Sequence, residues 1–211
     1  MPYDYLRDPE AIYQRSFELI RREADLSRFP AELHAIALRL VHAVADPTIL
    51  ADLSWSDGAV EVGRTALGRG VPVLVDAQMV AHGIIRARLP AGNAVTCLLD
   101  DPAVLALSRQ RKTTRSAAAL ELWAPLLDGA VVAIGNAPTA LFRLLELIED
   151  GAPLPALVLG FPVGFVGAAE SKAALVANRL GIAYVALAGR RGGSALAAAA
   201  VNALAIGEPG R

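Results

Sequence analysis

His42 is the side chain of this sequence best suited to proton transfer near neutral pH, because imidazole titrates in that range. It lies in a helical pattern over residues 30–46. The apolar stripe of that pattern consists of Leu33, Ile36, Ala37, Leu40, Val41 and Val44. At about 100° per residue, His42 points away from this stripe, on the side of Ala35, Leu38 and Ala45. We therefore predict that His42 lies outside the core, on an apolar side that a ligand or another subunit covers.

Two interpretations of His42 stay open on this geometry: a functional residue, or a plain surface or interface histidine. A zinc pair is disfavoured because His34 lies about 80° away around the helix, whereas paired histidines are normally four residues apart. The single cysteine, Cys97, lies in an apolar run and is predicted to be a small core residue. The sequence therefore predicts no disulfide, no metal and no other cofactor.

Four loops rich in small residues follow predicted strands and lead into helices. They are residues 76–79, 135–139, 160–167 and 189–194. Backbone amides at helix N-termini bind carboxylate or phosphate oxygens, so these loops are candidate anion sites. Thr113, Thr114, Arg115 and Ser116 open a further helix and add a cation with hydroxyl groups. Together they predict a ligand with many negative groups, although turn geometry alone explains the glycines of any one loop.

Standard phosphate and nucleophile motifs do not match. The glycine spacings at 160–167 and 189–193 are not those of a dinucleotide-binding loop. Lys172 lacks the preceding glycine that a P-loop requires, and no Gly-x-Ser-x-Gly elbow is present. Any chemistry must therefore use a histidine, anion sites and the shape of a pocket.

The elements that must position these residues follow an alternating pattern. Predicted strands lie at 71–75, 94–99, 130–134, 156–159 and 182–187. The helices that follow them are predicted at 77–80, 102–110 with 115–127, 138–149, 168–180 and 194–205. A turn is expected around residues 54–57, and a short helix over residues 59–67. This pattern predicts an α/β fold: a mainly parallel five-stranded sheet, helices on both faces and two N-terminal helices.

Length and composition fit a single domain over residues 1–211, with a frayed tail at 207–211. The net charge of −1 gives no basic field for nucleic acid or an anionic membrane. No signal peptide or membrane-spanning stretch is evident, so we expect a soluble cytoplasmic protein. The positive mean hydropathy of +0.44 indicates apolar surface that a partner subunit covers.

The first predicted helix begins with Asp8 as N-cap and Pro9 at the first helical position. Ser16 lies on its apolar face beside Phe17. A serine there either bonds back to the carbonyl four residues earlier or contacts a ligand, and both interpretations stay open.

Four runs in this sequence are those of a known family. The runs TRSAAA at 114–119, GNAPTALF at 135–142, GFPVGFVGAAESK at 160–172 and GRRGGS at 189–194 closely resemble the precorrin-8X methylmutase (precorrin isomerase) family of cobalamin biosynthesis. The similarity extends from Ser16-Phe17 and residues 39–42 to residues 202–204, and it is weakest over 46–69. Arg191 lies where lysine is equally expected.

The resemblance implies an isomerase that moves the methyl group at C-11 of the corrinoid macrocycle to C-12. Precorrin-8X would become hydrogenobyrinic acid, or cobalt-precorrin-8 would become its cobalt-containing equivalent, cobyrinic acid. A [1,5]-sigmatropic shift breaks and forms carbon–carbon bonds within one conjugated ring, and it is expected to need no cofactor. The enzyme must bind the transition state better than the substrate.

The resemblance also implies roles for particular residues. His42 would donate a proton or a hydrogen bond to a ring nitrogen. The acetate and propionate groups of the substrate are expected to meet Ser16, Arg39, Arg115, Ser116 and Asn136, since arginine holds carboxylates with paired donors. A homodimer with its pocket near the subunit interface is implied, and the product would pass to the next enzyme of the pathway.

Two other functions are compatible with the same sequence features. The same loops could form a non-catalytic corrinoid carrier, which would stop at stoichiometric binding where a catalyst turns over. A nucleotide-binding α/β domain is the third possibility, and micromolar binding of ATP or NAD without corrinoid affinity would favour it.

Overall fold

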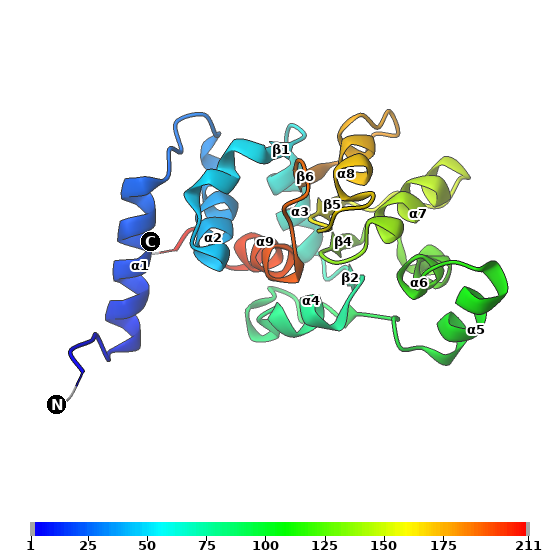
Figure 1. The fold of residues 1–211 in the computed structure, drawn as a ribbon, viewed down its shortest axis with the longest axis horizontal. Helices are drawn as coiled ribbons and strands as arrows, with labels where there is room; N and C mark the ends of the chain where they lie inside the picture. Colours follow the sequence, from blue (N-terminus) through cyan, green and yellow to red (C-terminus); the bar gives the residue numbers. More distant parts are fainter. Residues whose placement is uncertain (1–2, 210–211) are drawn as a thin grey trace.

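A six-stranded sheet lies between helices in the computed structural model, which describes residues 3–209 (Figure 1). The strands are β1 (Leu53–Trp55), β2 (Val73–Val75), β3 (Val95–Thr96), β4 (Val131–Ile134), β5 (Leu157–Gly160) and β6 (Tyr184–Leu187). Their order is β1-β6-β5-β4-β2-β3, and every neighbouring pair is parallel except β1 with β6. The predicted α/β fold with a mainly parallel sheet is confirmed, with six strands rather than five.

The additional strand, β1, forms where the sequence predicted a turn around residues 54–57. It pairs antiparallel with β6, with Leu53 opposite Leu187, and the turn begins at Asp57. A three-residue strand with a serine at its centre has no apolar run to reveal it. Its formation depends on hydrogen bonds to an edge far along the chain, which local sequence cannot show.

The helices cover both faces of the sheet. They are α1 (Pro9–Glu23), α2 (His34–Val44), α3 (Ala59–Gly68), α4 (Gln78–Gly83), α5 (Pro102–Arg111), α6 (Arg115–Trp123), α7 (Pro138–Glu149), α8 (Ala168–Val176) and α9 (Ser194–Ile206). Short 3₁₀ helices are η1 (Ala31–Leu33), η2 (Pro47–Asp52), η3 (Arg86–Arg88) and η4 (Ala124–Leu126). The predicted helix over 168–180 ends early at Val176, because the Asn178 side chain binds Leu175 O, Leu180 N and Ile182 N instead.

Side chains of the parallel strands alternate between two hydrophobic cores. Val131 and Ala133 face the core shared with α2, α3, α4 and α9, whereas Val132 and Ile134 face the core under α6, α7 and α8. Strands buried on both faces read as unbroken apolar runs, which is why the sequence revealed them.

The alanine-rich helix α9 allows three other elements to come very close to it. A Cβ atom added at Gly83, the last residue of α4, would lie 2.7 Å from the Ala198 Cβ. One added at Gly135, after β4, would lie 2.8 Å from the Ala197 Cβ. On another side, α9 packs against α2. Small residues on both partners therefore set these short separations.

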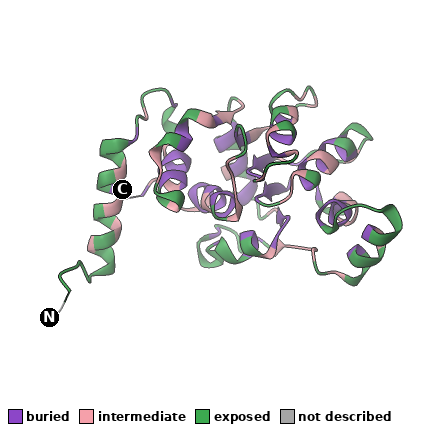
Figure 2. Ribbon diagram, in the orientation of Figure 1, coloured by how far each residue is buried: buried purple, intermediate pink, exposed green. Residues whose placement is uncertain are grey.

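Helix α2 lies between α1 and α9 and is buried on nearly all sides (Figures 1 and 2). Ala35 and Leu38, predicted to form an exposed apolar side, are 2% and 0% exposed. Val44, predicted to be core, is 40% exposed. Packing by two helices on opposite sides explains why Ala35 and Leu38 are buried, because a single stripe fits a helix with one buried face. Val44 is the last residue of α2.

Helix α1 lies at one end of the molecule and is exposed over most of its length (Figure 2). Phe17 is its one buried residue. The chain near its C-terminus reaches α1, where Arg21 contacts Pro209 O and Glu208. We predicted a frayed tail over 207–211. Glu208 and Pro209 are held against α1 by these contacts, and residues 210–211 lie outside the described residues.

Over residues 3–209, the longest helices are too short or too polar to cross a lipid bilayer.

Candidate active site

His42 is positioned by two side chains of α1. The Ser16 hydroxyl is hydrogen-bonded to His42 Nδ1 at 3.0 Å. The Phe17 ring stacks on the imidazole, with centroids 4.8 Å apart and planes inclined by 21°. Ser16 therefore contacts His42 and makes no bond back to the carbonyl of its own helix, so the first interpretation of Ser16 is wrong and its contact with a ligand stays a prediction. The hydrogen bond and the stack together fix the plane of the imidazole ring.

The second ring nitrogen of His42, Nε2, makes no hydrogen bond to any of residues 3–209. When Ser16 donates to Nδ1, the neutral ring carries its hydrogen on Nε2 and can donate it outward. Partial burial, and then the positive charge of Arg39, lower the pKa of the His42 imidazole below its usual value. The lowered pKa favours the neutral ring at neutral pH, and in this tautomer the ring can donate a hydrogen bond outward from Nε2.

Arg39 lies one turn before His42 on α2, and its donors are incompletely used. Its Nη2 donates to the Tyr13 hydroxyl at 3.2 Å, and its guanidinium lies 6.0 Å from the centre of the Phe17 ring. Its Nε is buried and has no hydrogen-bond partner within the described chain. A buried donor without a partner is costly, which makes Arg39 a candidate ligand-binding group.

A pocket of about 220 Å³ opens beside His42. It is lined by Ser16, Leu19, Ile20, Glu23, Val41, His42, Ala45 and Pro47. Pockets for drug-sized ligands measure roughly 300–1,000 Å³. This pocket can therefore hold part of a large ligand but cannot enclose a macrocycle.

Arg115, Ser116 and Asn136 form a second cluster at the carboxyl edge of the sheet. Thr114, the N-cap of α6, and Thr139, in the first turn of α7, share a hydrogen bond of 2.7 Å, which holds the two helix starts together. Arg115 is exposed and lies 3.6 Å from an oxygen of Asp100. Asn136 is also exposed, whereas Ser116 is buried.

The amides of residues 135–137, in the 135–139 loop, are already occupied by a carboxylate of the protein itself. Asp76, at the end of β2, accepts hydrogen bonds from the backbone N–H groups of Gly135 (2.8 Å), Asn136 (3.0 Å) and Ala137 (2.7 Å). Burial raises the pKa of the Asp76 carboxyl, and the three amide donors offset part of that effect. The prediction that these amides bind a ligand anion is therefore wrong for this loop: they position Asn136 instead.

The predicted site residues thus fall into two groups. Ser16, Arg39 and His42 meet between α1 and α2, whereas Arg115, Ser116 and Asn136 lie at the starts of α6 and α7, toward the other end of the molecule (Figure 1). Sequence reasoning missed Tyr13 and Phe17 as site residues. Tyr13 lies three residues before Ser16, Phe17 follows Ser16 directly, and Tyr13 and Phe17 are four residues apart. This helical spacing was the available signal. Asp76 was missed because its partners are distant in sequence.

Among residues 3–209, no group of three or more His, Cys, Asp or Glu side chains is placed to hold a metal ion.

The fold and the site define an α/β protein in which a hydrogen-bonded histidine lines a small pocket beside a mainly parallel sheet. Residues 11–206 match the family model described as precorrin-8X methylmutase. The chain belongs to the precorrin-8X methylmutase family and is an enzyme of the isomerase class.

Relatives cover almost the whole chain. A precorrin-8X methylmutase from Sinorhizobium is 58% identical over 96% of this chain and 97% of its own length. One from Pseudomonas aeruginosa is 57% identical, with the same coverage of both chains. A cobalt-precorrin-8 methylmutase from Priestia megaterium is 36% identical over 94% of this chain and 88% of its own. These relatives are methylmutases, so they give the carrier alternative no support.

A solved structure also matches the fold. The precorrin-8X methyl mutase from Thermus thermophilus aligns with a TM-score of 0.84 and 44% identity, over 92% of this chain and 93% of that one.

Proposed function

We propose that this enzyme moves the C-11 methyl group of precorrin-8X to C-12, giving hydrogenobyrinic acid, with His42 as the hydrogen-bond or proton donor to the macrocycle. The observation that carries this role is the 3.0 Å contact between Ser16 and His42 Nδ1, which leaves Nε2 to face a ligand. The family membership supplies the reaction.

The reaction asks little of the protein beyond selective binding. The bond from C-11 to the methyl carbon breaks as the bond to C-12 forms, and the ring double bonds shift, so substrate and product are isomers. Donation from His42 to a ring nitrogen would select the reactive tautomer and stabilise charge that develops during migration. When the protonated His42 ring transfers its proton, general acid catalysis contributes roughly 10²- to 10⁴-fold in rate.

Carboxylate recognition is the second part of the proposal. Arg39 has a buried donor without a partner, directly beside His42, and is the group best placed to bind an acetate side chain of the ring. Arg115, Ser116 and Asn136 would hold other carboxylates at the edge of the sheet. Because Arg115 is exposed, its contribution is expected to be smaller.

A second copy of the chain would complete the pocket. Two observations support this part of the proposal: the pocket of about 220 Å³ is too small for a macrocycle, and apolar side chains near it are exposed. Leu19 lines the pocket and is 39% exposed, and Val44 is 40% exposed. Covering these side chains would bury apolar area and close the site. Light scattering after size exclusion should give the mass of a dimer, and a monomer that turns over at the full rate would contradict this part.

The metal-free ring is the substrate we propose. The two relatives at 57–58% identity are named for precorrin-8X, whereas the cobalt-precorrin-8 enzymes are 32–39% identical. Precorrin-8X is therefore expected to give the higher kcat/KM of the two substrates. Faster turnover of cobalt-precorrin-8 would reverse this assignment.

Turnover beyond one equivalent tests the function itself. Purified protein is mixed with a fiftyfold excess of precorrin-8X, and hydrogenobyrinic acid is followed by its absorption spectrum. A catalyst converts the excess. Conversion that stops at one equivalent per site would leave only binding and would refute the proposal.

A further inference from the structure

Arg191, in the loop after β6, uses all the nitrogen atoms of its guanidinium within the protein. Nε and Nη2 donate to Asp52 Oδ2 at 3.1 and 2.7 Å. Nη1 donates to Asp46 Oδ2 at 3.2 Å and to Thr48 Oγ1 at 2.9 Å. Nη2 also donates to Thr48 O at 3.1 Å. These are five hydrogen bonds, as many as a guanidinium has N–H groups.

All three partners belong to the segment that follows His42 along the chain. Helix α2 ends at Val44, and Ala45 adopts a left-handed conformation with a φ of 52°. Asp46 then caps η2 by accepting a hydrogen bond from Thr48 N at 2.9 Å. Ala45 and Pro47, on either side of Asp46, both line the pocket beside His42. Arg191 therefore holds the wall of that pocket at its middle residue.

The backbone of Arg191 is fixed as well. Its carbonyl accepts a hydrogen bond of 2.6 Å from Lys172 Nζ, and Lys172 is 1% exposed. The next residue, Gly192, lies so close to the preceding loop that an added Cβ would be 2.4 Å from Phe161 O. Gly193 N donates to the same carbonyl at 2.8 Å. The backbone at Arg191 is thus held at the ends of β5 and β6, which belong to the central sheet.

We infer that Arg191 is a positioning residue, which holds the pocket wall of residues 45–47 against His42 and does not itself bind a substrate carboxylate. This inference rests on the function proposed above. The loop at 189–194 resembles an anion site in sequence, yet Arg191 has no donor left for a ligand, and Asp46 and Asp52 offset the charge of Arg191. The other arginine of the loop, Arg190, lies over the Phe165 ring at 5.4 Å. A guanidinium offers five donors in a planar fork, whereas the ammonium group of lysine offers three. Arginine can therefore make all five hydrogen bonds at position 191 and lysine cannot.

The two roles predict opposite results when the acceptors are removed. For a positioning residue, R191Q and D52N both loosen the wall, so both should lower kcat by about 10- to 100-fold, the usual effect of misplacing a catalytic group, with KM within twofold. For a carboxylate ligand, R191Q would raise KM, and D52N would release the guanidinium and lower KM. The second pattern would overturn the inference.

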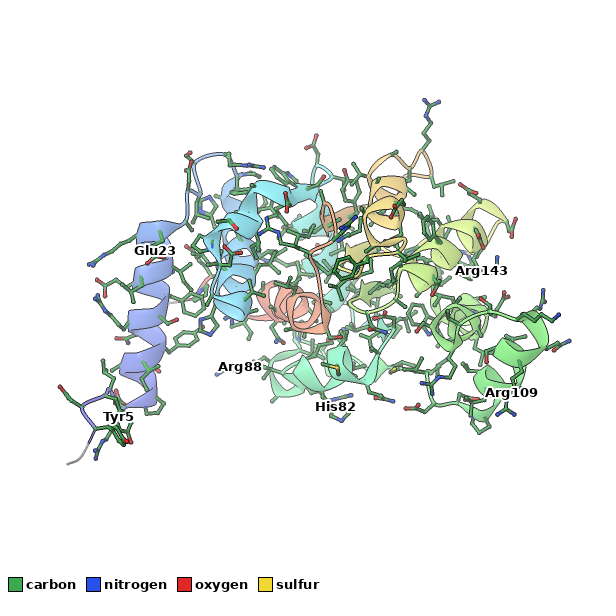
Figure 3. The ribbon with its side chains drawn as sticks, in the orientation of Figure 1. Tyr5, Glu23, His82, Arg88, Arg109 and Arg143 are labelled. Carbon is green, nitrogen blue, oxygen red and sulfur yellow. The ribbon has the colours of Figure 1, made fainter. Side chains whose placement is uncertain are left out.

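Milder variants guard against loss of folding. D46N keeps an N-cap oxygen for Thr48, and R191K keeps the positive charge with fewer donors, so each should lower kcat less than R191Q. The matched control is R143K, because Arg143 also pairs with two carboxylates, Glu121 and Glu146, but lies on α7 (Figure 3). The kcat of R143K should equal that of the wild type. Equal losses in R143K and R191K would reduce Arg191 to a stabilising ion pair.

A readout without substrate separates this inference from the proposed function. The His42 imidazole is titrated by NMR in wild type, R191Q and R143K. A moved wall changes the surroundings of His42, so R191Q should shift the titration midpoint and R143K should not. If wild-type protein fails to turn over precorrin-8X but this shift is seen, the proposed function fails and the positioning role stands. An unchanged midpoint with unchanged kcat in R191Q would refute the positioning role.

Discussion

Arg39 and Arg191 are two partly exposed arginines whose surroundings differ in one respect, the number of donors that the protein itself uses. Arg191 makes five hydrogen bonds to one short segment, from Asp46 to Asp52. Arg39 makes one, to Tyr13, and keeps a buried Nε without a partner. The same contrast separates Asp76, which fills three backbone amides, from His42, which has an unused ring nitrogen. On the proposed function, the unused hydrogen-bonding capacity of Arg39 and His42 is left for a ligand, whereas Arg191 and Asp76 use theirs to hold parts of the protein in place.

The strongest test of this contrast is H42A. If the unused nitrogen of His42 serves the reaction, kcat should fall by about 10²- to 10⁴-fold, while product affinity and folding change little. Steady-state rates and equilibrium titration with hydrogenobyrinic acid measure the two effects. H82A is the matched control, because His82 lies on the outer side of α4 (Figure 3) and binds Gln78 O. Equal turnover by H42A and wild type would remove His42 from the reaction.

R39Q is expected to have the next largest effect. Losing a charge-assisted hydrogen bond costs about 1.5–3 kcal/mol, so the Kd for substrate should rise about 10- to 100-fold. By contrast, R191Q should leave the Kd for substrate nearly unchanged. A Kd that rises in R191Q and not in R39Q would invert the contrast.

S16A should lower kcat by a smaller factor. A single neutral hydrogen bond is worth about 0.5–1.5 kcal/mol, which corresponds to about 2- to 10-fold when it orients a catalytic ring. Since Phe17 still stacks on the imidazole, the ring keeps part of its orientation. S108A serves as the control for kcat, because Ser108 lies on α5 and bonds to Leu105 O. A loss of kcat as large as in H42A would show that Ser16 does more than orient His42.

R115A should weaken substrate binding by about 2- to 5-fold, because exposed ion pairs contribute about 1 kcal/mol or less. Arg115 is exposed and close to Asp100, so its charge is already partly offset. The effect should diminish as salt is added, which titrations at two ionic strengths would reveal. Unchanged affinity at low salt would exclude Arg115 from the pocket.

The pH dependence of stability tests Lys172, whose Nζ donates to a carbonyl of the protein itself. Burial lowers the pKa of Lys172 to about 8, while the unfolded chain keeps its lysines protonated to higher pH. The unfolded state therefore binds more protons between about pH 8 and 10, and the free energy of unfolding should rise there by up to about 1.4 kcal/mol per pH unit. Urea denaturation measures this slope. K172M should abolish the rise and K112N should preserve it; the same slope in K172M would assign the effect to another group.

The sequence predicted those parts of the fold that rest on local patterns. The five parallel strands were recognised because Val131 and its neighbours are buried on both faces and read as apolar runs. Helix α1 was recognised from Asp8 and Pro9, and Asp8 does accept a hydrogen bond from Ala11 N. Strand β1 was missed because Ser54 interrupts its apolar character, and its pairing with β6 is a tertiary property.

The candidate site was predictable to a similar degree. His42 was identified by its chemistry and its position on the helix, yet its partner Ser16 is 26 residues away and could not be assigned from spacing. The amides of residues 135–137 were predicted to bind anionic groups of a ligand, and that prediction was wrong because Asp76 fills them. A sequence shows which groups can bind a charge and not whether the protein supplies that charge.

The close approach of α9 to Gly83 and Gly135 limits which residues these two positions can accept. A single methyl group at either glycine meets an alanine of α9 at less than 3 Å, so a larger residue would push α9 away. Because α9 also supports α2, such a push would reach His42, far from the substituted position. Substitution of either glycine is therefore expected to lower activity although neither residue does chemistry, and a random library should lose activity there before it loses the fold.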